Sequence, residues 1–573
     1  MKNYCAKCLS FIFICILSCT SKPEETGIRI RFDQDPESLH PLSYGNAPAL
    51  QILNHVYQSL LTVDLADKSI RPLLAAELPS VRKTDSTSLF TFSIRPEAQW
   101  DNGSPITAQD VAFSLKLLHS PLIDNERWRA QYEFIKDIQL SQRDPRSFTL
   151  VCSGYTPEMR LMAGDFFVLP SYQFDPKGTL ASVSYQLIRQ KFDSLALTPT
   201  FKAFATIINN VAMARDTSLI KGSGPYRLRK WNAGQSITLE KKKPWWGDGV
   251  NPHVPALQAR PSHIVFQIIP DNASAILALK ASQLELMDNI PLIPFLEMQR
   301  ERKYQQLFNF HTPTSYELIF MGVNGQNPIL QDRSTRQALA HLLDIPQIIN
   351  SLQGGLATPT VGFVHPQEKE FYNSDLPILK FDKPKARNLL LAAGWRQTST
   401  GWEKKINGKI HQLKLDLLHK VGNSDFENMS LLFQQNAKSL GIPVTLQALE
   451  SSQISERLQT RKFDLYFRTL IGNPFSYNLI PLLHTSNAKN GGGNVTSFGT
   501  AETDLLLEKI ANEELPEEKA LLLKSLQQKM QEESNMIFLY FSKNRIAVSK
   551  QMDSVIISGL KPGYDVTRAF LKK

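Results

Sequence analysis

The sequence lacks the short motifs that mark the common hydrolases and nucleotide-binding enzymes. It contains no His-Glu-x-x-His zinc motif, no Gly-x-Ser-x-Gly nucleophile turn and no Walker-type phosphate loop. Its eleven histidines are scattered, and His411 and His419 share no spacing that suits a metal ion. We therefore expect neither an enzyme nor a protein with a cofactor or a bound metal. A secreted hydrolase with a hidden carboxylate pair stays an alternative, which turnover of a bound ligand would reveal.

Long apolar runs are absent beyond the first residues. Lys2 and Lys7 precede an apolar run from Leu9 to Leu17, and this run is too short for a permanent membrane span. Residues 1–18 therefore read as a cleaved export signal. The sequence Ile16-Leu17-Ser18-Cys19 resembles a bacterial lipobox, which implies that Cys19 is lipidated and that residues 19–26 form a tether to an inner or outer envelope membrane. An ordinary signal peptide and an uncleaved anchor are the alternatives.

Cysteine is scarce in the remaining chain. Cys5, Cys8 and Cys15 lie within the predicted signal, so the Cys-x-x-Cys spacing there is neither a redox nor a zinc motif of the exported protein. Only Cys19 and Cys152 follow. Because a lipidated Cys19 has no free thiol, we expect no disulfide and a fold that a hydrophobic core stabilises.

Concentrated charge is also missing. The formal net charge is +10, but the densest basic runs, 241–243 and 404–405, are short and lie near predicted hairpins. This dispersed pattern is typical of a solvated basic surface and argues against a nucleic-acid partner.

The elements that are present alternate between strand and helix. Ile28 to Phe32 and Ile264 to Ile269 are predicted strands, and a tight turn at residues 101–103 leads to a helix that Thr107 and Asp110 cap. A chain of 573 residues exceeds what one core usually serves. We expect an α/β protein with two or three lobes.

Several blocks along the chain resemble, in order, the family 5 extracellular solute-binding proteins, which are the oligopeptide, dipeptide and nickel receptors of ATP-driven importers. No single block is decisive, but together they cover residues 28–573 almost continuously. The blocks are 100–116, 222–231, 245–287, 324–344, 382–395 and 441–465.

The resemblance implies a two-lobed periplasmic-binding-protein-like fold that closes about a hinge, with an extra α+β domain inserted in lobe one. By analogy, lobe one takes residues 27–70, 214–300 and 536–573, the extra domain 71–213, and lobe two 301–535. Strand 536–541 would lead back across the hinge. Such a receptor favours its closed state only through ligand contacts made on both lobes.

The resemblance also implies a function and a site. It predicts a monomeric periplasmic lipoprotein that captures peptides by strand addition and delivers them to a permease and ATPase complex. The matching stretches are Tyr44, Gly45, Asn46 and Ala47 in lobe one, and Tyr466, Phe467, Arg468, Thr469 and Leu470 in lobe two. The second stretch also fits a core strand with alternating burial.

One position departs from the family pattern. Peptide receptors carry an aspartate four residues before a proline here, where it pairs with the ligand's ammonium group; counting back from Pro474 gives Leu470. Leucine makes no charge-assisted bond, whereas Asn473 could accept a neutral one and Arg468 would suit an anion. A small slip in the alignment, which would hide the true partner, is the alternative. A non-peptide solute, such as an oligosaccharide, metal chelate, haem or another anion, is therefore the main alternative. A signalling or adhesion lipoprotein with the same fold is a further one.

Overall fold

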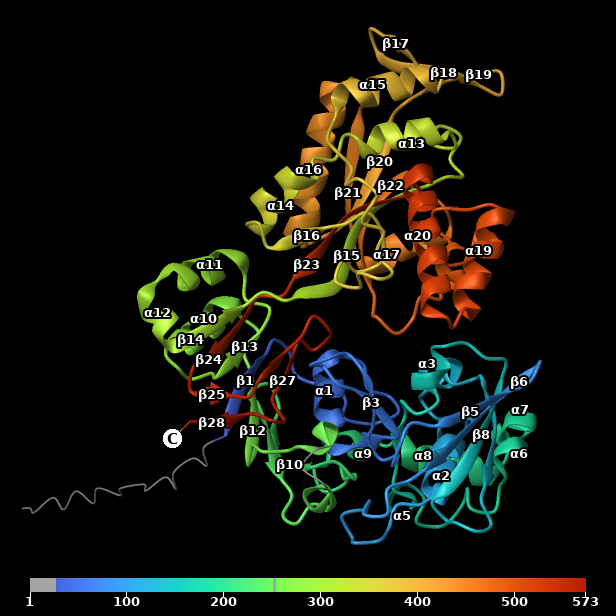
Figure 1. Cartoon of the computed structure of the whole chain (residues 1–573), viewed down its shortest axis with the longest axis vertical. Helices are drawn as coiled ribbons and strands as arrows, with labels where there is room; N and C mark the ends of the chain where they lie inside the picture. The colour runs from blue at the N-terminus through green and yellow to red at the C-terminus, as the bar shows by residue number, and fades with distance from the viewer. Residues whose placement is uncertain (1–26, 251–253, 573) are drawn as a thin grey trace, which may run out of the picture.

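The computed structural model describes residues 27–250 and 254–572, which form two lobes joined by two crossing segments (Figure 1). The predicted signal at 1–18, the tether at 19–26 and the lipidation site Cys19 lie outside these residues. Within them, no helix has the length and apolar character needed to span a bilayer.

Lobe one is built on a mixed seven-stranded sheet. Its central strand β1 pairs in parallel with β12 and β13, while the remaining neighbours are antiparallel. In sheet order the strands are β10 (Tyr226–Asn232), β11 (Ser236–Lys241), β12 (His263–Ile268), β1 (Ile28–Phe32), β13 (Leu286–Met287), β24 (Ile546–Ser549) and β14 (Phe308–His311). The helices of this lobe are α1 (Ala47–Val56), α10 (Asn272–Lys280), α11 (Leu292–Arg300) and α12 (Arg302–Leu307).

The extra domain lies beside α1 and shares its hydrophobic core with lobe one (Figure 1). A four-stranded antiparallel sheet runs in the order β5 (Ser80–Lys83), β6 (Thr87–Ser93), β8 (Ser147–Ser153) and β7 (Ile135–Leu140). Short strand β9 (Phe167–Val168) pairs with β2 (Gln58–Ser59), and β3 (Leu61–Val63) pairs with β4 (Ile70–Pro72). The helices are α2 (Ala108–Leu118), α3 (Glu126–Gln131), α4 (Met159–Met162), α5 (Ser171–Phe174), α6 (Tyr185–Gln190), α7 (Phe192–Ala196), α8 (Pro199–Ile208) and α9 (Val211–Arg215).

Lobe two is a six-stranded mixed sheet with helices on both faces. The strands are, in order, β16 (Ala357–Pro359), β23 (Met536–Lys543), β15 (Thr314–Val323), β22 (Leu465–Ile471), β20 (Leu415–Lys420) and β21 (Val444–Leu449). Alternate residues of β15 enter two separate cores, as β-strand geometry requires. One core takes side chains from α13 (Arg333–Ala340), α14 (Ile345–Gln353), α15 (Lys383–Ala392) and α16 (Ser424–Ser439); the other takes them from α17 (Ser451–Gln459), α18 (Ile480–Leu483), α19 (Ala501–Asn512) and α20 (Pro516–Glu533).

The crossing segments lie later in the chain than the resemblance implied. β14 still pairs within the lobe-one sheet, so lobe one extends to residue 311 rather than 300. β23 pairs with β15 along the lobe-two sheet, so lobe two extends to residue 543 rather than 535. The strand pairing decides both boundaries. The two crossing segments contact each other, because the Asn544 N–H donates to the Pro313 carbonyl at 3.0 Å.

Local signals in the sequence are reproduced by the structure. β1 spans the predicted residues 28–32, and α2 begins directly after Thr107. The Thr107 N–H donates to the Asp110 carboxylate at 2.8 Å, which satisfies one of the free donors at the helix start.

Candidate functional site

Five neighbouring cavities that share lining residues run from the extra domain to the space between the lobes, and we call them together the interlobe cleft. The cavities have volumes of about 230, 300, 200, 600 and 260 Å³. Leu50 and Asn54 line both the first and the second cavity, and Asn289 lines the second, third and fourth. Lys561 and Glu317 connect the fifth cavity to the second and the third. A single extended ligand could therefore touch all of these spaces.

The predicted lobe-one residues lie at the start of α1, on the wall of this cleft. Tyr44 lines the first cavity and Ala47 lines the second. Asn46 caps α1: its side chain accepts the Ala49 N–H and donates to the Asp35 carbonyl at 2.9 Å. Gly45 is exposed between them. The cap holds this loop in place, so its backbone is presented to the cleft in a defined position.

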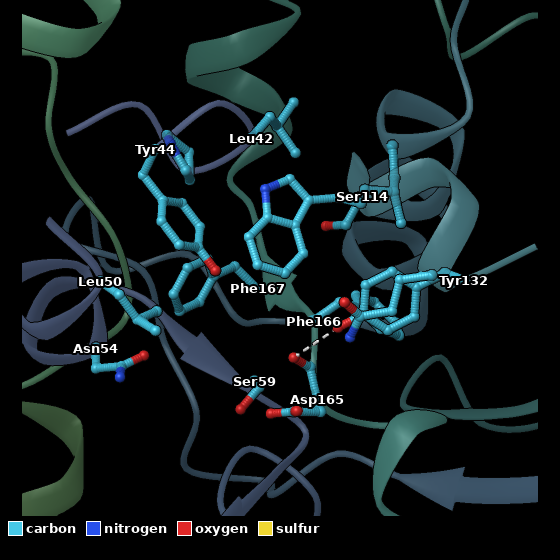
Figure 2. Close-up of a pocket in the computed structure, with 14 residues that line it drawn as sticks. Leu42, Tyr44, Leu50, Asn54, Ser59, Ser114, Tyr132, Asp165, Phe166 and Phe167 are labelled. Atoms are coloured by element: carbon cyan, nitrogen blue, oxygen red, sulfur yellow. Dashed lines mark hydrogen bonds between the residues drawn. The ribbon is translucent and has the colours of Figure 1, made fainter. Parts of the chain in front are cut away.

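The first cavity is an aromatic pocket, which we define by Tyr44, Trp128, Tyr132, Phe166, Phe167 and Asp165 (Figure 2). The loop before α1, helix α3 and the segment around β9 supply these residues. The rings of Tyr44 and Trp128 lie 4.8 Å apart between centroids, and Tyr132 meets Phe166 edge-on at 5.7 Å. The pocket therefore lies where lobe one meets the extra domain.

Asp165 is the acidic member of the aromatic pocket. Asp165 is exposed to the cavity, and the protein atoms packed around the carboxyl partly desolvate it, which raises its pKa to about 7. The Tyr132 hydroxyl donates to the main-chain carbonyl of Asp165 at 3.1 Å and not to the carboxylate (Figure 2). The same desolvation raises the pKa of Tyr44 and of Tyr132 above the usual value, so both phenols stay neutral.

The predicted lobe-two residues form β22, and two of their side chains are not available to a ligand. Tyr466 and Phe467 are each 2% exposed. Phe467 stacks on Phe426 at 6.1 Å, and the ring of Tyr466 occupies the space that Gly322 leaves by having no side chain. These two residues therefore stabilise the cores on either face of the sheet.

The far half of β22 has an unpaired edge. β15 pairs with β22 from Leu465 to Ile471, but β20 pairs only with Leu465 and Tyr466. Among the described strands, none continues the ladder beside residues 467–471. Thr469 lines the third cavity and Ile471, which is 65% exposed, lines the fifth. The free strand edge therefore borders the cleft.

The remaining predicted residues contribute less to the five cavities. The Arg468 side chain is exposed but lines none of the five cavities, and Leu470 packs against a lobe-two core. Asn473 lines the fifth cavity, yet its side-chain oxygen accepts the N–H groups of Phe475 and Ser476. That oxygen shapes a local turn, so position 470 and position 473 supply no free anionic group.

An ion pair spans the cleft, between residues that the sequence patterns did not identify. Glu317 of β15 pairs with Lys561 of lobe one at 2.8 Å. Burial raises the pKa of Asp288 to about 6, although nearby Lys561 acts in the opposite direction. Glu317 is the one charged residue of its strand, and Asp165 interrupts an apolar run. A charge within a buried segment was the signal that could have identified both.

The comparisons with known proteins agree with this geometry. Residues 69–490, well over half of the chain, match the model of the bacterial extracellular solute-binding proteins, family 5. The oligopeptide-binding protein AppA of Bacillus subtilis is 22% identical over 96% of this chain and 93% of its own. The nickel-binding periplasmic protein of Escherichia coli is 23% identical over 73% of this chain and 71% of its own.

Solved structures show the same fold. The structure of AppA from Bacillus subtilis in complex with a nonapeptide has a TM-score of 0.67 at 20% identity, covering 95% of this chain and 99% of the other. NikZ from Campylobacter jejuni in complex with Ni(L-His) has a TM-score of 0.64 at 19% identity, covering 93% and 96%. At these identities the likeness establishes the fold and leaves the choice between peptide and metal chelate open. By its family match, the chain belongs to the family 5 bacterial extracellular solute-binding proteins, which are non-enzymatic receptors of the peptide and nickel class.

Proposed function

We propose that this protein is the substrate-binding component of an ABC-type importer and that it captures peptides in the interlobe cleft. On this proposal the ligand lies between residues 44–47 and β22, and the closed receptor delivers it to a permease and ATPase complex. The predicted lipid at Cys19 would hold the monomer at an envelope membrane on the periplasmic side.

The observation that carries this proposal is the free edge of β22. An extended peptide can add to such an edge through main-chain hydrogen bonds, which do not depend on the peptide's sequence. The cavities on either side then take the side chains, which point alternately to opposite faces of a strand. The named relatives that bind oligopeptides support the same reading.

A non-peptide solute is the second candidate, and one observation favours it. Neither Leu470 nor Asn473 offers a free carboxylate to a peptide's ammonium group.

For a peptide ligand, we assign the role of holding the ammonium group to Glu317. Its carboxylate lies beside the end of β22, because Glu317 pairs with Ile471 across the sheet. Among the described residues there is no group of three or more metal-ligating side chains.

The test is the identity of the ligand that the protein retains. Native mass spectrometry of protein purified without denaturant, followed by small-molecule analysis after denaturation, should release a mixture of short peptides. A single non-peptide mass would overturn the peptide assignment and leave the family membership untouched. Glu317→Gln, with Glu297→Gln as a control outside the cleft, should weaken peptides with a free N-terminus more than their acetylated forms.

A further inference from the structure

The aromatic pocket has a charge pattern that suits a cation. Asp165 is the only charged residue that lines it, and no lysine, arginine or histidine does so. In the described part of the chain, no side chain forms an ion pair or a hydrogen bond with its carboxylate. Asp165 is exposed to the cavity, so a positively charged ligand group can reach its carboxylate and form a charge-assisted bond with it.

The hydroxyl groups of Ser59, Ser114 and Tyr132 do not pair with this carboxylate. Ser59 donates to the Leu61 carbonyl, and Ser114 donates to the Asp110 carbonyl. The Tyr132 hydroxyl donates to the main-chain oxygen of Asp165. These protons are therefore engaged elsewhere, and the carboxylate stays available to a ligand.

The rings of the pocket add a second attraction for a cation. Tyr44 and Trp128 lie 4.8 Å apart and are tilted by 33°, and Phe167 lies 6.3 Å from Tyr44. An ammonium or guanidinium group over such ring faces is attracted by their quadrupoles, and the attraction grows when water is excluded. The guanidinium of Arg127 lies 5.0 Å from the centre of the Trp128 ring, but Arg127 does not line the pocket.

From this arrangement we propose that the aromatic pocket selects a positively charged side chain, lysine or arginine, at one position of the bound peptide. The inference rests on the proposed function and specifies which ligands the receptor prefers. The methylene stem would pack among the rings, and the charged end would pair with the Asp165 carboxylate.

The size and position of the pocket fit a single side chain. Its volume of about 230 Å³ is below the roughly 300 Å³ at which sites for whole small molecules begin. Leu50 and Asn54 also line the next cavity of the cleft, so the pocket lies beside the space where we place the peptide backbone.

The experiment measures peptide affinity by isothermal titration calorimetry at pH 8 with the full exported protein. The ligands are alanine pentapeptides that carry one lysine, or one Nε-acetyl-lysine of similar shape, at each position in turn. At one position we expect lysine to bind about tenfold more tightly than acetyl-lysine, as a desolvated cation–π contact and a charge-assisted bond together allow. At the other positions the two should bind alike.

Asp165→Asn is the variant that tests the carboxylate, and Asp85→Asn is its matched control. Asp85 is an exposed residue of the same domain and lies outside the pocket. Asp165→Asn should abolish the preference for lysine while alanine pentapeptide still binds, and Asp85→Asn should keep the preference. Because Asp165 is exposed and no described side chain pairs with its carboxylate, we expect Asp165→Asn to fold. Trp128→Leu should reduce the preference in part.

The outcomes separate this inference from the proposed function. If peptides bind but lysine and acetyl-lysine are equal at every position, the inference is wrong and the receptor role stands. If no peptide binds, the peptide function fails, and the pocket is tested with n-butylammonium against n-butanol in a thermal-shift assay. A shift that butylammonium alone produces and Asp165→Asn removes supports a cation site; equal shifts, or none, refute it.

Discussion

The two walls of the cleft are built in different ways. On the lobe-one side, loops and helix ends from lobe one and the extra domain place side chains such as Tyr44, Trp128 and Asp165 around one pocket. On the lobe-two side, β22 buries Tyr466 and Phe467 in its own cores and leaves a strand edge toward the cleft. One wall therefore presents side-chain chemistry, whereas the other presents the main chain.

This difference suggests a division of roles. Main-chain hydrogen bonds along β22 would give affinity for any extended peptide, and the aromatic pocket would add a preference for one kind of side chain. Closure would then depend on both walls, since a ligand favours the closed state only through contacts that the open state lacks.

Phe467→Ala should have the largest effect, and it should act on stability. Removing a buried aromatic ring costs about 3–5 kcal/mol of the free energy of unfolding, which chemical denaturation measures. The sequence resemblance places Phe467 among the candidate ligand-binding residues, but its burial makes it a core residue. Arg468→Ala, at an exposed position of the same strand, should change the stability by less than about 0.5 kcal/mol. Equal stability of both variants would contradict the placement of Phe467 in the core of lobe two.

Methylation of the peptide backbone should have the next largest effect. An N-methyl group removes one N–H of the peptide. The β22 carbonyl that would accept from this N–H is then left unpaired, which weakens the binding free energy by about 1–3 kcal/mol. We expect losses at alternate amides only, because successive N–H groups of a strand point to opposite sides, and calorimetry on singly methylated peptides checks this. Equal losses at every amide would argue against strand addition to β22.

The lysine preference of the aromatic pocket should depend on pH. The pKa of Asp165 is raised to about 7, so its carboxylate is present above that pH and becomes protonated below it. The facing phenols of Tyr44 and Tyr132 stay neutral throughout, and Arg127 stays charged. An advantage of about tenfold at pH 8 should therefore decline toward none at pH 5. Acetyl-lysine peptides are the control: their affinity should not follow this titration, and a parallel decline would exclude Asp165 as its cause.

Lys561→Ala should have the smallest effect. The Lys561–Glu317 pair joins the two walls, but the lysine side chain is half exposed, and such pairs contribute about 0.2–1 kcal/mol. We expect the ligand affinity to change less than fivefold and the change to shrink in high salt. Lys572→Ala is the matched control, because that lysine pairs with Asp553 inside lobe one at similar exposure. A loss above tenfold would mean that Lys561 contacts the ligand directly.

Much of the fold was predictable from local patterns. Alternating and apolar runs identified β1 and the core of β12, and the Thr107 and Asp110 pair located the start of α2. The lobe boundaries were less accurate, because they depend on which distant strand β14 and β23 pair with. No periodicity within a strand specifies its partner.

The candidate site was predictable only in part. The sequence directed attention to Tyr44 and to the strand from Tyr466 to Leu470, and both border the cleft. It did not identify Trp128, Asp165 or Glu317, since their importance comes from neighbours far away in the chain. Nor did it separate the buried side chains of β22 from its free edge.

The sequence by itself determined the α/β class, the order of the elements, the capped helices and the resemblance to family 5 receptors. These features depend on residues a few positions apart, or on an ordered series of motifs. Only the tertiary structure decided which side of β22 is covered and which residues form the aromatic pocket. A strand shows the same alternating sequence pattern whether its side chains pack into a core or face a ligand. Which of the two lies against each face depends on packing between distant parts of the chain.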